Sequence, residues 1–191
     1  MAPLTMLVGL SVIGAISAAK EQGDRLERKI AEIVKNAAAE PAAPRRTPMP
    51  EPEVNSYLNV NLKEKIPRGL TEPQISFIGN GRLGGRVFVD IDEFKRQRGS
   101  GGILDPLSYV SGRVPLTASG MLTSKQGKGR FQLLSAEMLG IPVPKPLVQE
   151  LVTFFSRTQE NPRGINLDEP FQLPAKIREI IVNPGEAILL Q

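Results

Sequence analysis

The feature that most constrains the fold is a long alternating stretch at residues 110–122. Its apolar and small residues fall mainly on one side of an extended chain and its polar residues mainly on the other, as in a half-buried strand. At about 3.3 Å per residue, this stretch would span about 43 Å, whereas an ordinary strand has about 5–6 residues. We therefore predict one long strand that bends or bulges. The alternative is two ordinary strands broken at Pro115, which cannot donate to a ladder.

The remaining folded part reads as an antiparallel meander with a helix inserted late. We expect helices over residues 53–65 and 146–157, and strands over residues 74–78, 86–94, 130–138, 171–174, 176–182 and 186–190. The return strand has the pattern of a bulge at Leu133-Leu134. Pro184-Gly185 suits the central positions of a type II turn. This order of elements predicts an α+β fold.

The composition excludes much chemistry. The chain has no cysteine and no histidine, so it cannot form a disulfide, a thiolate nucleophile, a Cys/His zinc site or a histidine base. The glycine-rich motif at residues 79–84 matches GxGxxG, but an alternating strand follows it where a nucleotide site needs a helix. We therefore expect no enzyme, and assign no catalytic residue, metal ligand or cofactor. A net charge of +4 does not indicate a nucleic-acid partner.

The N-terminal third suggests export. Residues 4–19 are apolar and uncharged, but shorter than the span of about 20 residues that a bilayer requires. Residues 1–19 are thus a cleaved signal peptide, an uncleaved anchor or a buried core helix, and either of the first two carries the domain across a membrane. Residues 20–53 read as a helical spacer followed by a stiff proline-rich linker. The folded domain is expected over residues 54–191.

The helix at residues 146–157 is the candidate ligand-binding element. A helix of about 12 residues is only about 18 Å long, so it cannot cover strands that exceed about 40 Å. The sheet must then curl over the helix, the helix expected over residues 53–65 must help to cover it, or some apolar surface remains for a ligand or a partner. An acyl chain would suit such a surface, because each buried methylene contributes about 0.8 kcal/mol without a specific polar contact. The candidate lipid-binding residues are Val114, Leu116, Leu147, Leu151, Phe154 and Phe155, and the candidate headgroup contacts are Lys95, Arg96 and Arg98.

Three short stretches have a further pattern in common. The first reads EVNSYL at residues 53–58, the second LGIPVP at residues 139–144, and the third LPAKIREIIV at residues 173–182, followed by GEAILLQ at residues 185–191. In this order they resemble the opening helix, the turn before the late helix and the closing strands of bacterial cell-envelope proteins with a lipid-binding domain, the LmeA-like and YpmS-like proteins. The resemblance spans residues 55–191.

The resemblance implies a tubular lipid-binding-like architecture, in which a long, strongly curved antiparallel sheet wraps around a helix and leaves an apolar groove. It implies no catalytic residues. The expected function is non-enzymatic binding of lipid acyl chains at the bacterial cell envelope, in lipid transport or envelope maintenance, with the protein periplasmic or anchored at the membrane surface. The alternative is a membrane-anchored structural or adaptor module with a fully packed core, which binds an unknown protein partner.

Overall fold

Two antiparallel sheets and the helices around them form the protein. The computed structural model describes residues 6–40, 43–98 and 109–191. The larger sheet has the order β2-β3-β4-β5-β6, with β7 paired to β5, and the smaller has the order β1-β9-β8. The strands are β1 (Arg46–Pro50), β2 (Leu70–Gly79), β3 (Arg82–Asp90), β4 (Arg113–Lys125), β5 (Lys128–Met138), β6 (Ile141–Pro142), β7 (Phe171–Gln172), β8 (Glu179–Asn183) and β9 (Glu186–Leu190). The expected α+β class is confirmed.

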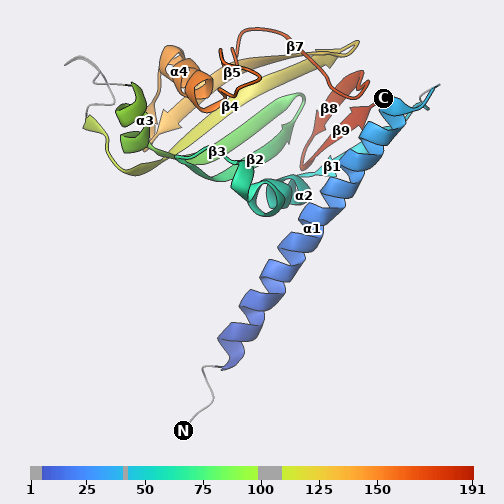
Figure 1. Ribbon diagram of the computed structural model, residues 1–191, viewed down its shortest axis with the longest axis horizontal. Coiled ribbons are helices and arrows are strands. Elements are labelled where there is room, and N and C mark those ends of the chain that lie inside the picture. Colours follow the sequence, from blue (N-terminus) through green and yellow to red (C-terminus); the bar gives the residue numbers. More distant parts are fainter. Residues whose placement is uncertain (1–5, 41–42, 99–108) are drawn as a thin grey trace.

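The helices lie around the sheets. They are α1 (Met6–Ala38), α2 (Glu51–Ser56), the π-helix η1 (Tyr57–Asn61), the 3₁₀-helix η2 (Lys63–Lys65), α3 (Ile91–Arg98) and α4 (Lys145–Phe155). In Figure 1, α3 and α4 lie toward one end of the large sheet and β8 and β9 toward the other, while α1 projects away from both sheets at its N-terminal end. The helix expected over residues 53–65 is present as α2, η1 and η2, and α4 lies within two residues of its expected bounds.

The long strand that the sequence predicts is present in the structure as β4. β4 contains 13 residues and runs through Pro115 without a break, so the two-strand alternative is wrong. It begins and ends three residues later than the expected range of 110–122. The Pro115 carbonyl accepts from the Leu139 N–H. A residue's N–H and C=O point to the same side of a strand, so the missing N–H of Pro115 faces β5, whose pairing with β4 starts only at Leu116. No bond to β3 is lost. The expected bulge is confirmed, because the β4–β5 register passes from Ser135 to Leu133.

Tight turns fix the hairpins of the large sheet. The β2–β3 turn is Asn80-Gly81, with φ of 53° and 79°, and the β4–β5 turn is Gln126-Gly127, with φ of 52° and 79°. Positive φ at both central positions is the type I′ geometry that fits the twist of paired strands. At the β8–β9 turn, Gly185 has φ of 78°, as the expected type II turn requires.

One expected strand, residues 86–94, is wrong in its second half. β3 ends at Asp90, and residues 91–98 form α3. The Asp90 side chain accepts a hydrogen bond from the Glu93 N–H at 2.9 Å, which is the bond of a helix N-cap residue. With Glu93 three residues later, this is the capping-box spacing. The helix turns Ile91 and Phe94 inward, and both side chains are fully buried.

Part of the stretch expected as a stiff proline-rich linker belongs to a sheet instead. Residues 46–50 form β1, which pairs with β9. β1 is an edge strand of its sheet, where proline is tolerated because half of the backbone groups need no ladder partner. In α1, Leu26 and Ile33 are buried, and Lys29 pairs with Glu53 at 2.7 Å. The packed unit therefore includes residues on the N-terminal side of the expected boundary at 53.

Several parts of the N-terminal expectations lie outside the described residues. These are residues 1–5 of the expected signal or anchor and Pro41 of the expected linker. Within the described ranges, no helix combines the length and apolarity that crossing a membrane requires.

Candidate functional site

The six side chains expected to bind lipid come together around Phe94. Val114 and Leu151 are buried in one core cluster with Val89, Ile91, Phe94 and Met138, and half-buried Leu116, Leu147, Phe154 and Phe155 pack against it. The Phe94 ring meets the Phe154 ring edge to face, with centroids 4.9 Å apart. The α4 end of the sheet is therefore filled by its own side chains. Phe94, its central residue, was missed as a site neighbour because residues 91–94 read as strand.

Two of the six residues also border a small surface pocket. A depression of about 390 Å³ is lined by Phe154 and Phe155 together with Pro67, Arg68 and Arg157. Lipid contact by the six residues stays a prediction, and the burial of Val114 and Leu151 assigns those two to the core.

The apolar side of the large sheet extends well beyond this cluster. We call the side that carries Val89, Val114 and Met138 the apolar face. The strand register places a row of cross-strand neighbours on this face beyond the α4 cluster. They are Ile75, Gly85, Ala118 and Ala136. All but Ile75 are small, so the row forms a shallow floor that crosses four strands.

Gly85 shows that part of this floor is open. Its exposed backbone has no atom close above it, because an added Cβ would meet only the Gln74 carbonyl oxygen, at 3.9 Å. Leu83 and Leu133, the next large side chains along the strands, are half-buried. An apolar face with a small-residue floor and half-exposed flanks is a shape that a flexible apolar ligand can fill.

Phenylalanine rings cover the floor farther from α4. A Cβ on Gly120 would lie 2.1 Å from the Phe131 ring, and one on Gly129 would lie 2.5 Å from the Phe171 ring. At the same end, β8 is joined to β4 through Ser124, which exchanges hydrogen bonds with the backbone of Ile180. The open floor thus lies between the α4 cluster and these covered glycines.

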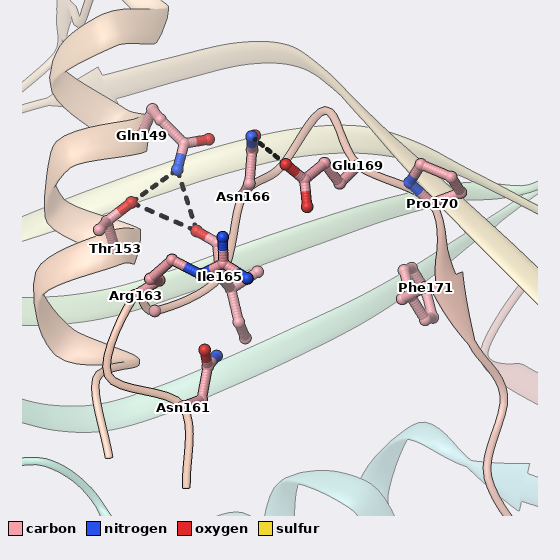
Figure 2. Close-up of a pocket in the computed structure, with 10 residues that line it drawn as sticks. Gln149, Thr153, Asn161, Arg163, Ile165, Asn166, Glu169, Pro170 and Phe171 are labelled. Atoms are coloured by element: carbon pink, nitrogen blue, oxygen red, sulfur yellow. Dashed lines mark hydrogen bonds between the residues drawn. The ribbon is translucent and has the colours of Figure 1, made fainter. Parts of the chain in front are cut away.

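A larger pocket than the one beside Phe154 and Phe155 lies on the same side of the sheet. It has a volume of about 840 Å³, within the range of small-molecule sites. Figure 2 shows it between α4, which carries Gln149 and Thr153, and the segment leading to Phe171. α4 packs on the apolar face through Leu151, and Phe171 covers Gly129 on that face, so the pocket lies over it. The full lining is Gln149, Thr153, Asn161, Arg163, Gly164, Ile165, Asn166, Glu169, Pro170 and Phe171.

Hydrogen bonds from Gln149 hold the far wall of this pocket to α4. Its amide nitrogen donates to the Ile165 carbonyl at 2.9 Å, and its amide oxygen accepts from the Leu167 N–H at 2.8 Å. Ile165 and Phe171 remain more than 40 % exposed. The pocket thus combines two exposed apolar side chains with a polar rim. Sequence reasoning missed it, because residues 161–170 show no periodicity that would place them over the sheet.

The expected headgroup cluster is partly occupied by the protein itself. Lys95 donates to the Val110 carbonyl at 2.5 Å, and Arg96 pairs with Glu93. Glu93 raises the pKa of the Arg96 guanidinium through this hydrogen bond. The Arg98 side chain lies outside the described residues. In the part of the chain that the structure describes, no three acidic side chains lie close enough to hold a metal ion.

Comparisons with known proteins identified no relative of this chain. No family model, no curated protein and no solved structure matches this chain.

Proposed function

We propose that this protein binds lipid acyl chains, without catalysis, on the open part of the apolar face at the bacterial cell envelope. The observation that carries the proposal is the open space above Gly85 on an otherwise apolar sheet face. An acyl chain lying there would cover Ala118 and the flanks of Leu83 and Leu133. Each methylene buried would contribute about 0.8 kcal/mol, so affinity would grow with chain length without specific polar contacts.

The pocket beside Gln149 would take the polar end of such a ligand. It lies over the same face and has a rim that includes Arg163 and Asn161. In this proposal the sheet curls around α4 and the ligand, as in tubular lipid-binding proteins. The apolar N-terminal part of the chain supports a location facing the cell envelope, exported or held at the membrane, in lipid transport or envelope maintenance.

Substitution of Gly85 tests the site directly. Gly85→Leu should place a side chain in the open space. It should weaken the affinity for a fluorescent fatty acid at least about tenfold, which is a loss of about 1.4 kcal/mol in binding free energy. The melting temperature should not fall, because the added side chain meets no atom closer than 3.9 Å at its Cβ. Titration of the delipidated full-length chain gives the affinity, and thermal melts give the stability.

Gly84→Leu is the matched control. Gly84 is the neighbouring residue of the same strand, and its side chain would point to the opposite, polar face beside Ser76. This variant should bind fatty acid as the wild type does. Equal loss of binding in both variants, or a wild-type chain that binds no fatty acid of any length, would rule the proposal out.

A second candidate function is a structural or adaptor module that binds a protein. The filled cluster around Phe94 favours it, because all six residues expected to bind lipid belong to this cluster or pack against it. Native mass spectrometry of the purified chain separates the two. Co-purified species with the masses of lipids support acyl binding, and a bare chain that takes up no added fatty acid supports the adaptor.

A further inference from the structure

A group of cations gathers on the other side of the large sheet. We call the side opposite the apolar face the solvent face, and it carries Arg86, Thr117 and Glu137. Near the two hairpin turns it carries Arg82, Lys125, Lys128 and Arg130, here named the basic corner. All four are exposed. Arg82 pairs in register with Met121, Arg130 with Thr123, and Lys125 with Lys128, so the four lie within a few residues of one another across three strands.

The protein does not neutralise this corner. Among the described residues, none of the four forms an ion pair or a side-chain hydrogen bond. Lys125 and Lys128 stand directly opposite each other, an arrangement that destabilises a strand pair. The Glu179 side chain lines a surface pocket together with Lys125 but forms no ion pair with it. Arg178 lines the same pocket and adds a further cation.

We propose that the basic corner docks on the surface of a bilayer that contains anionic lipids. Exposed lysine and arginine side chains near such a surface are attracted additively, over about one Debye length. Thr123 pairs with Arg130 and Gln132 pairs with Met121 on the same face. The Thr123 hydroxyl and the Gln132 amide can hydrogen-bond to lipid headgroups beside the cations.

The form of the face favours a bilayer over a nucleic acid. Single strands are bound mainly by stacking bases on free aromatic rings. Strands β2–β5 are described in full, and the ring on their solvent face is that of Phe88. It lies toward the other end, with the guanidinium carbons of Arg86 and Arg113 at 5.0 and 4.6 Å from its centroid. Two guanidinium groups therefore already lie against this ring. The four residues of the basic corner lie on strands and at hairpin ends, and not on a helix that could enter a groove.

This docking goes beyond the proposed acyl binding and does not depend on it, because the two sites lie on opposite faces of the sheet. A protein held by the basic corner would keep the apolar face and the pocket beside Gln149 free. The corner also replaces the expected headgroup contacts at Lys95 and Arg96, whose side chains already have partners in the fold.

Vesicle co-sedimentation of the full-length chain tests the proposal. The two vesicle types are phosphatidylcholine alone and phosphatidylcholine with one third of the lipid replaced by phosphatidylglycerol. Attachment through the apolar N-terminal part would appear with both types, so the basic corner is measured by the difference between them. We expect the anionic vesicles to bind at least about tenfold more protein, and the excess to vanish as the Debye length falls at high salt.

The test variant replaces Arg82, Lys125, Lys128 and Arg130 with glutamine. Its control makes the same change of charge at exposed positions elsewhere, Lys35, Arg46, Lys63 and Lys65. The test variant should lose the anionic excess, whereas the control should keep it, and both should bind fatty acid as the wild type does. Equal loss in the two variants would overturn the proposal. So would tighter binding of the wild type to a DNA duplex than to the anionic vesicles at the same salt concentration.

Discussion

The two halves of the apolar face are closed in different ways. At the α4 end, buried Val89, Val114 and Met138 from three strands meet Phe94 of α3 and Leu151 of α4. Farther along the same strands, the row is buried at Ala136, but Gly85 is exposed, Ala118 is half-buried, and the large neighbours Leu83 and Leu133 stay half-buried. The apolar face of the large sheet therefore contains both a fully packed core and an open floor.

The difference follows from lengths that are visible in the chain. α4 has 11 residues, which is about 16 Å of helix, whereas β4 has 13 residues, or about 43 Å of strand. The β8–β9 end and the rings of Phe131 and Phe171 cover the opposite end. The floor between them is open at Gly85, and the following predictions test whether the two halves differ as described.

The largest effect should come from the filled half. Phe94→Ala removes a fully buried ring that touches Phe154 and Phe155 and should lower the free energy of unfolding by about 3–5 kcal/mol. Chemical denaturation of the two proteins measures it. A loss below about 1 kcal/mol would mean that this end is loosely packed and that the contrast between the halves is false.

A smaller loss is expected where a ring already covers the floor. In Gly120→Ala the new methyl would overlap the Phe131 ring and approach the Gln132 carbonyl oxygen to 2.9 Å. Overpacking of this kind costs about 1–3 kcal/mol. The same denaturation experiment measures it, and an unchanged stability would show that Phe131 moves aside freely.

The smallest effect should have the opposite sign. Gly85→Ala adds a methyl in open space, 3.9 Å from the nearest atom, and restricts the unfolded chain. It should stabilise the protein by about 0.5–1 kcal/mol. Gly85 and Gly120 lie on the same face, so the pair compares the open and covered floor with one chemical change. Destabilisation by both substitutions would contradict an open floor at Gly85.

The sequence predicted the parts of the fold that have a strong period. The alternation of residues 110–122 indicated β4 and the apolar face, and the apolar side chains of α4 indicated which residues would gather with Val114. The start of α3 was not predicted, because Val87, Val89 and Ile91 continue one alternating series that only the local cap at Asp90 ends. β1 was not predicted either, because its prolines are typical of a linker, and only its position at a sheet edge makes them compatible with a strand.

The position of the open floor was not predicted. Uncovered apolar surface was one of three outcomes expected from the short helix, and lipid contact, which stays a prediction, was assigned to the largest apolar residues. Large side chains fill the space around themselves, and Leu151 is accordingly buried. The open floor lies instead at Gly85 and Ala118, where small residues from separate strands meet. Only the register of the pairing brings them together, and a single sequence does not contain that register.

A crystal structure with a bromine-tagged fatty acid tests the central claim most directly. The anomalous signal of a bromine on the acyl chain marks where the chain lies. We predict a peak over the apolar face beside Gly85 and Ala118, between α4 and the Phe131 ring. A crystal with no peak at saturating ligand, or a single peak in the pocket beside Phe154 and Phe155, would contradict this account.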